Sequence, residues 1–475
     1  MSETRSSVNA PALDQAAIAL LRAAHRGPVV AAEDEEWEAS RRPWHSGVDQ
    51  QPALVAHVAD AADVEAVVRW AQQHGLAVAA QPRGHGATAH LDGTVLVRTA
   101  ALDEIAVDAA RRTARVGAGV SWQAMFDALD GTGLVALSGS NPSVTVVGLM
   151  LGGGLSWFGR AFGTPASSLL AVDLVDATGT SRTVTAESDP DLFWALRGGG
   201  GDFGVVTAVE IALHPAPELY GGRLAFAGEQ APEVLRAWAE VTRTAPDELA
   251  TWAMLMHLPD LPQIPEEVRG RSFMSVDVMF VGLPDEAEAL LAPLRAVGPT
   301  IRETVRALRA SEIGGIAEEP VEPGPPMRAV SHPFDVLDDD VLEHVLATAG
   351  VGSGTPLVGV QMRHLGGAQA AADPSTGPGA QIRPGYVLAA MAPAFSPEAA
   401  AVVDEALRGL VSAVPRSEHG LGITFLQADQ PIEDAYGAEA VGRLREVKQA
   451  VDPDGLFRSN HPVHPVHPVR PAPAT

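Results

Sequence analysis

Helix and strand patterns alternate along this whole sequence, which predicts a mixed α and β protein. A strand–helix–strand unit is expected over Pro52–Ala80, where helical and extended apolar patterns follow one another. Three glycine clusters, at 84–86, 152–154 and 198–201, each lie next to apolar, strand-like segments. The composition changes after Pro215–Pro217, so we expect the chain to divide into two parts there.

Composition narrows the class of function. The chain has 475 residues, 46% of them hydrophobic, which is enough for a sizeable core in two or three domains. A net charge of −26 argues against partners that carry phosphate backbones or anionic lipids. The absence of cysteine excludes disulfides, thiolate metal sites and cysteine nucleophiles. No apolar run reaches the roughly 18 residues of a membrane span, and residues 1–9 lack a signal pattern, so we expect a cytoplasmic protein.

Apolar periodicity and turn residues predict the elements of the first part. Helices are expected at Leu13–Ala24, Val64–His74 and Ser121–Leu129, and strands at Pro52–Val58, Leu76–Ala80, Thr94–Arg98, Ala114–Val120, Leu170–Asp176, Arg182–Thr185 and Val205–Leu213. The loop after the strand Leu76–Ala80, Gln81–Thr88, therefore lies at a strand end, where ligands commonly bind.

That loop contains one histidine between two glycines, in the order Pro82, Arg83, Gly84, His85 and Gly86. Glycine permits backbone conformations that bring the chain close to a ligand. Taken by itself, a loop histidine is more often a solvent-exposed residue, and it is the two further glycine clusters downstream that favour a ligand site.

The stretch 137–159 is unusually rich in small residues between apolar flanks. Backbone N–H groups at Ser138, Gly139 and Ser140 are candidates for binding a pyrophosphate without charged side chains. Interior glycines such as Gly148, Gly152, Gly153, Gly154 and Gly159 destabilise a chain unless something compensates, and we expect contact with a flat or phosphorylated ligand. The alternative is a patch where backbone segments pack together.

Two catalytic motifs are rejected on spacing. Gly117–Ala118–Gly119 lacks the third glycine of a nicotinamide-dinucleotide fingerprint, because Trp122 occupies that place. Ser156 lacks the glycine two positions later that a nucleophile elbow requires, because Phe158 stands there.

The second part, 217–435, is expected to combine helices with strands. The helices are Pro232–Thr244, Asp285–Val297 and Glu398–Ala413, and the strands are Ala250–His257, Arg271–Val281, Leu357–Leu365, Gly385–Met391 and Gly422–Leu426. Alternation places Gln361 and Arg363 on one face of their strand, with Met362 and His364 on the other. A final helix is expected at Glu439–Val451. The tail repeats His-Pro-Val from His461, and we expect 464–475 to be disordered rather than to bind metal.

In this order, four segments resemble the flavoproteins of the vanillyl-alcohol-oxidase type, and among them the berberine-bridge-enzyme-like oxidases. The segments are Pro82–Ala87, Ser138–Gly159, Asp189–Val206 and Asp452–Val463. The resemblance implies an α+β fold with a two-part FAD-binding domain and a substrate domain whose antiparallel sheet is covered by helices. The implied division is 1–216 (core 48–216) and 436–463 for FAD binding, with 217–435 for substrate.

The resemblance also implies site residues. His85 matches the histidine that carries FAD through the flavin 8α-methyl group, although the family more often has Arg-x-Gly-Gly-His at this loop. Asn141 replaces the cysteine of a second tether, so a single tether is expected, and Val144 matches a position associated with oxygen access. Gly204, Val205, Val206 and Asn460 are the remaining positions expected to contact FAD.

The family's usual general base is missing. Gly422 and Thr424 stand where relatives often have a tyrosine and an asparagine facing the flavin. We therefore expect Tyr386, with His364 behind it, to orient or deprotonate the substrate.

The resulting hypothesis is an FAD-dependent oxidase that passes electrons from an organic substrate to dioxygen. Methionines concentrate on the strands expected over the flavin and adapt to bulky planar ligands, which favours an aromatic or polycyclic substrate over a sugar. These residues are Met254, Met256, Met279, Met362 and Met391. An alcohol or amine substrate, a dehydrogenase with another acceptor, and a flavin-binding protein without turnover remain as alternatives.

Overall fold

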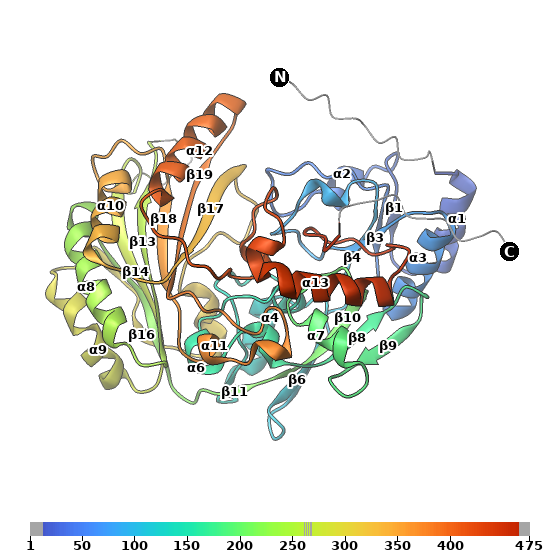
Figure 1. Ribbon diagram of the computed structural model, residues 1–475, viewed down its shortest axis with the longest axis horizontal. Coiled ribbons are helices and arrows are strands. Elements are labelled where there is room, and N and C mark those ends of the chain that lie inside the picture. The colour runs from blue at the N-terminus through green and yellow to red at the C-terminus, as the bar shows by residue number, and fades with distance from the viewer. Residues whose placement is uncertain (1–12, 261, 263, 265, 267, 465–475) are drawn as a thin grey trace.

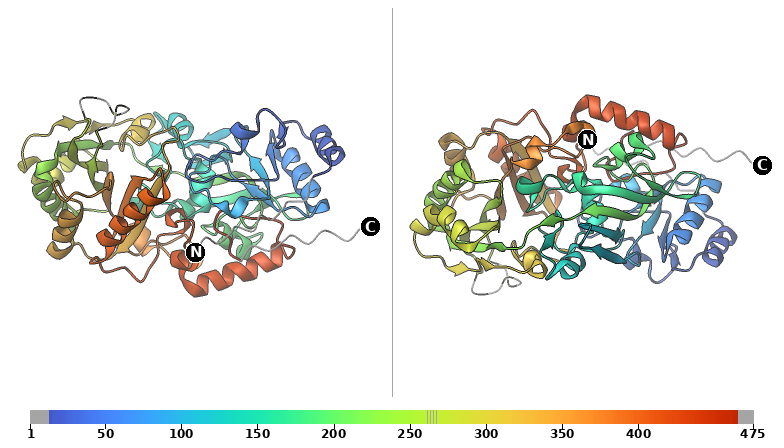
Figure 2. Two further views of the ribbon diagram at one scale, coloured as in Figure 1. Left: turned by 90° about the horizontal axis from the view of Figure 1, so that it is seen from above. Right: turned by 90° about the horizontal axis from the view of Figure 1, so that it is seen from below.

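The computed structural model describes residues 13–464 except 261, 263, 265 and 267, and these residues form two lobes (Figure 1). The first lobe is built from the chain up to β11 (His214–Pro215) together with the C-terminal helix α13 (Glu433–Val451). The second lobe extends from β12 (Leu219–Ala227) to α12 (Pro397–Val411). The change of lobe coincides with the change of composition after Pro215–Pro217. Figure 2 shows the two lobes side by side from above and below.

The strand–helix–strand unit predicted at the start of the first lobe is present. Parallel strands β2 (Leu54–His57), β4 (Val95–Arg98) and β3 (Val78–Ala80) follow one another in a sheet, with β1 (Val29–Val30) antiparallel to β2. Helix α3 (Ala61–Gln73) begins where Asp60 accepts hydrogen bonds from two backbone N–H groups, and its Val64, Val67 and Val68 are fully buried. The loop of His85 therefore follows the carboxyl end of β3.

A second sheet of the first lobe is antiparallel. Its strands follow the order β5 (Ile105–Asp108), β6 (Thr113–Gly117), β10 (Val205–Ala212), β8 (Leu169–Val175) and β9 (Ser181–Val184). Short helices connect or cover these strands: α4 (Trp122–Leu129), α5 (Val146–Leu151), α6 (Gly159–Phe162) and α7 (Pro190–Leu196), while α1 (Gln15–Ala24) and α2 (Trp37–Arg41) lie near the parallel sheet. Strand β11 pairs with β7 (Leu134–Val135).

The second lobe is one large antiparallel sheet. Its strands are β15 (Arg302–Glu303), β12, β14 (Ser272–Val281), β13 (Leu249–His257), β18 (Gly359–His364), β19 (Tyr386–Pro393) and β17 (Met327–Phe334) in this order, and β16 (Arg306–Ala307) also pairs with β12. Helices α8 (Ala231–Thr244), α9 (Pro284–Ala296), α10 (Asp339–Ala349) and α12 cover one face, which we call the outer face (Figure 1).

The opposite, inner face of this sheet meets the first lobe. Ala250, Trp252 and Met279 belong to a hydrophobic core shared with first-lobe residues. The indole rings of Trp252 and Trp157 stack with centroids 3.7 Å apart. The two lobes therefore share a packed interface along the inner face.

The C-terminal segment returns to the first lobe. Phe457 forms a parallel bridge with Val78 of β3. The buried Lys448 ammonium donates to Asp452 and to the carbonyl of Asp202, and the Asp202 carboxylate accepts from the backbone N–H groups of Ser459 and Val463. These bonds fix the end of the chain beside the loop of His85.

The structure confirms the α+β class and most predicted elements. The segment Gly422–Leu426 is an exception: it is not a strand but contains a 3-10 turn, Ile423–Phe425, preceded by Gly422 at φ = 94°. Strands β12 and β17 and helix α10 were not predicted, and β17 contains Pro333, a residue that argues against a strand in a sequence pattern. The expected tail lies outside the described residues except for its first residue.

None of the helices within the described part of the chain is long and apolar enough to span a membrane.

Candidate flavin-binding and substrate site

His85 is held by ring stacking and by the backbone of its loop. Its imidazole lies parallel to the Trp44 indole, with ring centroids 4.2 Å apart and planes 16° from parallel. Two consecutive carbonyls of the loop, of Arg83 and Gly84, accept hydrogen bonds from the N–H groups of Trp44 and His45. Gly84 has φ = 89°, a conformation that favours glycine. The sequence therefore folds this loop against the segment after α2.

The other edge of His85 faces Ser143. Ser143 Oγ lies 3.3 Å from His85 Nε2 and donates its own proton to Asn141 Oδ1 at 2.7 Å. A hydroxyl has one proton to donate, so Ser143 accepts from Nε2–H, which leaves the Nδ1 lone pair free. Burial, together with the nearby Arg83 and His45, lowers the pKa of His85 to about 4. The ring is thus neutral at physiological pH.

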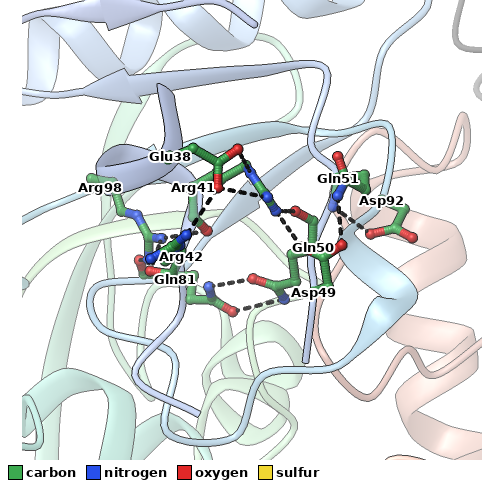
Figure 3. Close-up of polar contacts among 9 residues, drawn as sticks. All are labelled: Glu38, Arg41, Arg42, Asp49, Gln50, Gln51, Gln81, Asp92 and Arg98. Carbon is green, nitrogen blue, oxygen red and sulfur yellow. Dashed lines mark hydrogen bonds and ion pairs between the residues drawn. The ribbon is translucent and has the colours of Figure 1, made fainter. Parts of the chain in front are cut away.

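Arg98 connects Arg41 and Arg42, at the end of α2, to Gln81, which begins the His85 loop (Figure 3). Its buried guanidinium donates to the carbonyls of Ser40, Arg41 and Arg42, at the C-terminal end of α2, and to the carbonyl of Gln81. Carbonyls at a helix end carry partial negative charge, which favours a cation there. Burial without a carboxylate partner lowers the pKa of Arg98 to about 10.

A buried amide pair supports the same loop. Gln50 and Gln81 each donate to the other's amide oxygen, at 3.2 and 2.8 Å, and both side chains are almost completely shielded from solvent (Figure 3). The Asn460 amide donates to Gln81 and accepts from the Thr88 N–H. In this structure Asn460 therefore supports the His85 loop through hydrogen bonds. A hydrogen bond from Asn460 to the flavin stays a prediction.

The loop at 138–141 offers unoccupied polar groups. Ser138 Oγ is fully buried and has no hydrogen-bond partner among the described residues. A Cβ atom added at Gly139 would make only ordinary van der Waals contacts. A Cβ atom added at Gly86 would have no neighbouring atom within 4 Å. Buried polar atoms are normally satisfied, so the Ser138 hydroxyl indicates a missing partner. The predicted residues Ser140, Asn141 and Val144 lie on the same segment, which leads to Ser143.

The glycine clusters that were expected to contact ligand instead pack largely against the protein's own backbone. A Cβ atom at Gly198 would lie 2.5 Å from the backbone nitrogen of Gly379, and one at Gly379 would lie 2.7 Å from Cα of Gly153. The Tyr436 hydroxyl donates to the Gly198 carbonyl at 2.6 Å. The space beside the remaining predicted glycines is also occupied, at Gly148 by Thr145, at Gly152 by Thr424, at Gly154 by Leu149 and Pro165, at Gly159 by Gln369 and at Gly204 by Val175.

This junction supports the alternative interpretation of the clusters as backbone packing. The clusters bring α5, α7 and the 377–380 segment together. That their backbone N–H groups contact a cofactor stays a prediction. Val205 and Val206 begin β10 and pair with Val175 and Leu174, so their side chains are buried in the core.

The predicted catalytic pair lies on the side of the sheet away from the first lobe. Tyr386 is in the outer-face core, where its ring stacks on Phe334 and its hydroxyl donates to Thr242 of α8. His364 stacks on Tyr386, and its Nε2 accepts from Arg160 at 3.2 Å. The prediction that these groups act on substrate is therefore wrong in this structure, because the register places both of them on the helix-covered face.

The inner face carries the neighbouring residues of the same strand instead. Gln361 is paired in register with Met254, and Arg363 with Trp252. Of the five methionines expected to line the substrate site, Met362 lies in the outer-face core. The other four, Met254, Met256, Met279 and Met391, share the inner face.

Several residues of this site were missed from the sequence. No sequence motif contains the four missed residues, which are Trp44, Ser143, Gln50 and Arg98. They are brought together only by the pairing of β3 with β4 and by the return of the chain after α2. An arginine in an otherwise apolar strand, as at Val95–Arg98, was the one available signal, because a charge in a buried strand needs partners.

Known proteins resemble this chain in sequence and in structure. A family model described as FAD binding domain matches residues 52–185, and one described as berberine and berberine like matches residues 425–464. The (R)-6-hydroxynicotine oxidase of Paenarthrobacter nicotinovorans is 30% identical over 307 residues, which cover 62% of this chain and 63% of that protein. An FAD-dependent monooxygenase of Fusarium proliferatum (strain ET1) is 36% identical over 175 residues, 36% of this chain and 34% of that protein.

The aligned segments thus span less than two thirds of either relative. The crystal structure of 6-hydroxy-D-nicotine oxidase from Arthrobacter nicotinovorans is similar over 91% of this chain and 97% of that chain, with a TM-score of 0.77 and 25% identity.

Proposed function

We propose that the chain is an FAD-dependent oxidase of the berberine-bridge-enzyme-like type that acts on a hydrophobic aromatic or polycyclic compound, on the basis of the two matching family models and the similar oxidases. FAD would supply the redox chemistry, accepting a hydride equivalent from substrate and passing the electrons to dioxygen. The observation that carries the proposal is the neutral His85 ring, held between Trp44 and Ser143 with one ring nitrogen free.

The described residues fit such a cofactor. The free Nδ1 of His85 is the atom suited to a covalent bond, because a neutral nitrogen with a lone pair is a nucleophile. The Ser138 hydroxyl, together with the backbone N–H groups of Gly139 and Ser140, would bind the polar part of the cofactor, whereas the Ser138 N–H already donates to the Ala136 carbonyl. Arg98 and the Gln50–Gln81 pair act one step away by holding the His85 loop in place.

The inner face supports an aromatic substrate. Met254, Met256 and Met391 lie on it outside the core shared with the first lobe, and methionine side chains adapt to irregular, planar partners. The nicotine-oxidising relatives act on a compound with an aromatic ring, according to their names. A sugar would need more side chains able to pair with its hydroxyl groups.

Acid precipitation tests the covalent part of the proposal. Flavin is expected to remain with the polypeptide after precipitation of the wild type, and His85→Ala should release it. His419→Ala, at an exposed histidine with no role here, serves as the control and should retain flavin. Full release of flavin from wild type would refute the tether but not the binding of FAD.

Electron transfer is tested separately. Reduced protein mixed with air should reoxidise rapidly and form hydrogen peroxide, and a panel of aromatic compounds, amines and sugars should show turnover with aromatic members only. Slow reoxidation would instead indicate a dehydrogenase with another acceptor. Reduction by no compound of the panel would indicate a flavin-binding protein without turnover.

A further inference from the structure

Arg363 lies near the end of β18 on the inner face, which meets the first lobe. Its guanidinium carbon lies 3.9 Å from the centroid of the Trp252 ring, and that ring stacks in turn on Trp157. The backbone N–H of Trp157 donates to the carbonyl of Ser138, the residue with the unsatisfied hydroxyl. A continuous stack therefore connects Arg363 to the loop that we assign to the cofactor.

The hydrogen bonds of Arg363 leave most of its donors free. Its Nε–H donates to Gln361 Oε1 at 2.6 Å, and its two terminal amino groups have no hydrogen-bond partner among the described residues. Other shielded arginines differ. Arg223 on the same face forms two bonds to Asp277 and one to the Ala317 carbonyl, and Arg98 and Arg160 are surrounded by carbonyl acceptors.

Neighbouring carboxylates do not account for these donors. Asp277 attracts Arg363 from a distance, but its oxygens are bound by Arg223. Glu319 also attracts Arg363, yet the two form no ion pair within 4.0 Å. A half-buried guanidinium remains charged at neutral pH and needs acceptors.

We propose that Arg363 is a specificity-determining residue that binds a carboxylate on the aromatic substrate, an inference that rests on the proposed function and defines its substrate further. The planar fork of a guanidinium matches a carboxylate with two parallel hydrogen bonds. Trp252 fixes the plane of the fork from one side, and Gln361 fixes its rotation from the Nε edge.

A carboxylate fits better than a phosphate. Arg223 on the same face is already neutralised by Asp277, so it adds no free positive charge beside Arg363. A phosphate dianion would need more than one cation, and the net charge of −26 opposes multiply charged anions. The substrate class is thus an aromatic carboxylic acid, with its ring against the methionines.

Paired probes of equal shape and different charge test this. Purified holoprotein is titrated with 2-naphthoate and with 2-naphthamide, and binding is measured by calorimetry and by the perturbation of flavin absorbance. The wild type should bind the acid about tenfold more tightly than the amide, or better, because charged hydrogen bonds to the fork are lost with the amide. Arg363→Met should abolish this preference, and Arg363→Lys should retain part of it.

Arg115→Met is the matched control, since Arg115 is an exposed arginine on a first-lobe strand, and it should preserve the preference. Equal flavin content and melting temperature would show that each variant is folded. Equal affinity of wild type for the two probes, no binding of the acid, or an unchanged preference in Arg363→Met would overturn the inference. Calorimetry does not depend on turnover, so these outcomes are separate from failure of the oxidase tests above.

Discussion

At the scale of single residues, the alternation of side chains along β18 decides which of them face the proposed substrate site. Gln361 and Arg363 point toward the first lobe, whereas His364 lies beside Tyr386 in the outer-face core. His364 stays neutral in this position, because burial and the nearby Arg160 guanidinium together lower its pKa to about 3. The same histidine that looked catalytic in the sequence is thus a structural acceptor for Arg160.

Acid should destabilise the fold through this histidine. The pKa of His364 is about 3 in the folded protein and about 6.5 in the unfolded chain. Its contribution is therefore fully present above pH 6.5 and is lost as the pH falls, because protonation then favours the unfolded chain. Between pH 7 and pH 5 the free energy of unfolding should fall by about 2 kcal/mol more in wild type than in His364→Gln.

Urea denaturation at the two pH values measures this difference. Glutamine keeps an acceptor for Arg160 but does not titrate, so equal losses in both proteins would contradict the assignment of a depressed pKa to His364.

At the scale of elements, glycine allows three backbone segments to meet. Gly153 follows α5, Gly198 follows α7, and Gly379 lies on the segment between the last two long strands of the sheet. The Gly379 N–H donates to the Arg197 carbonyl, and Tyr436 of α13 closes the junction by donating to Gly198. Side chains here would separate elements of both lobes.

Gly198→Ala should therefore cost more than about 2 kcal/mol of the free energy of unfolding, because φ = 120° strains alanine and its Cβ would clash with Gly379. Gly442→Ala is the control: Gly442 lies in α13 with nothing near its Cβ position, and alanine should stabilise that helix by about 0.5–1 kcal/mol. Chemical denaturation of both variants provides the measurement. A neutral Gly198→Ala would show that the junction is loose.

At the scale of the whole molecule, hydrogen bonds between the two lobes hold them together beside the inner face of the large sheet. Arg160 of α6 enters the second lobe and donates to the carbonyls of Leu249, Leu365, Ala245 and Pro246. In the opposite direction, the segment 317–324 reaches the first lobe, where the Asn141 amide, the Trp44 indole and the Ser46 hydroxyl donate to its carbonyls. The segment therefore contacts Trp44, which stacks on His85, and Asn141, which accepts a hydrogen bond from Ser143 on the other side of the ring.

Removing the charge at Arg160 should loosen this interface. Arg160→Gln is expected to lose about 3–5 kcal/mol of the free energy of unfolding, because several buried carbonyls lose their donor. Arg115→Gln, at a half-exposed ion pair with Asp173, should change it by less than about 1 kcal/mol. Thermal and urea unfolding of the two variants give the comparison, and similar small losses would mean that Arg160 does not hold the lobes together.

Local information in the sequence determined the order of the elements, the α+β class and the position of the His85 loop. Capping residues such as Asp60, the periodicity of α3 and the glycines of tight turns act within a few residues, so they can be recognised without the fold. The segment Gly422–Leu426 was misassigned because its apolar pattern is too short to distinguish a strand from a turn.

Tertiary structure alone decided which side chains surround the site. Trp44, Ser143 and Arg98 are far apart in the chain, and their meeting at His85 depends on sheet order and on the return of loops. The choice between Arg363 and His364 depends on which face of the large sheet meets the first lobe. Strand alternation defines two faces, but only the packing of four helices on one of them determines which face remains for the substrate.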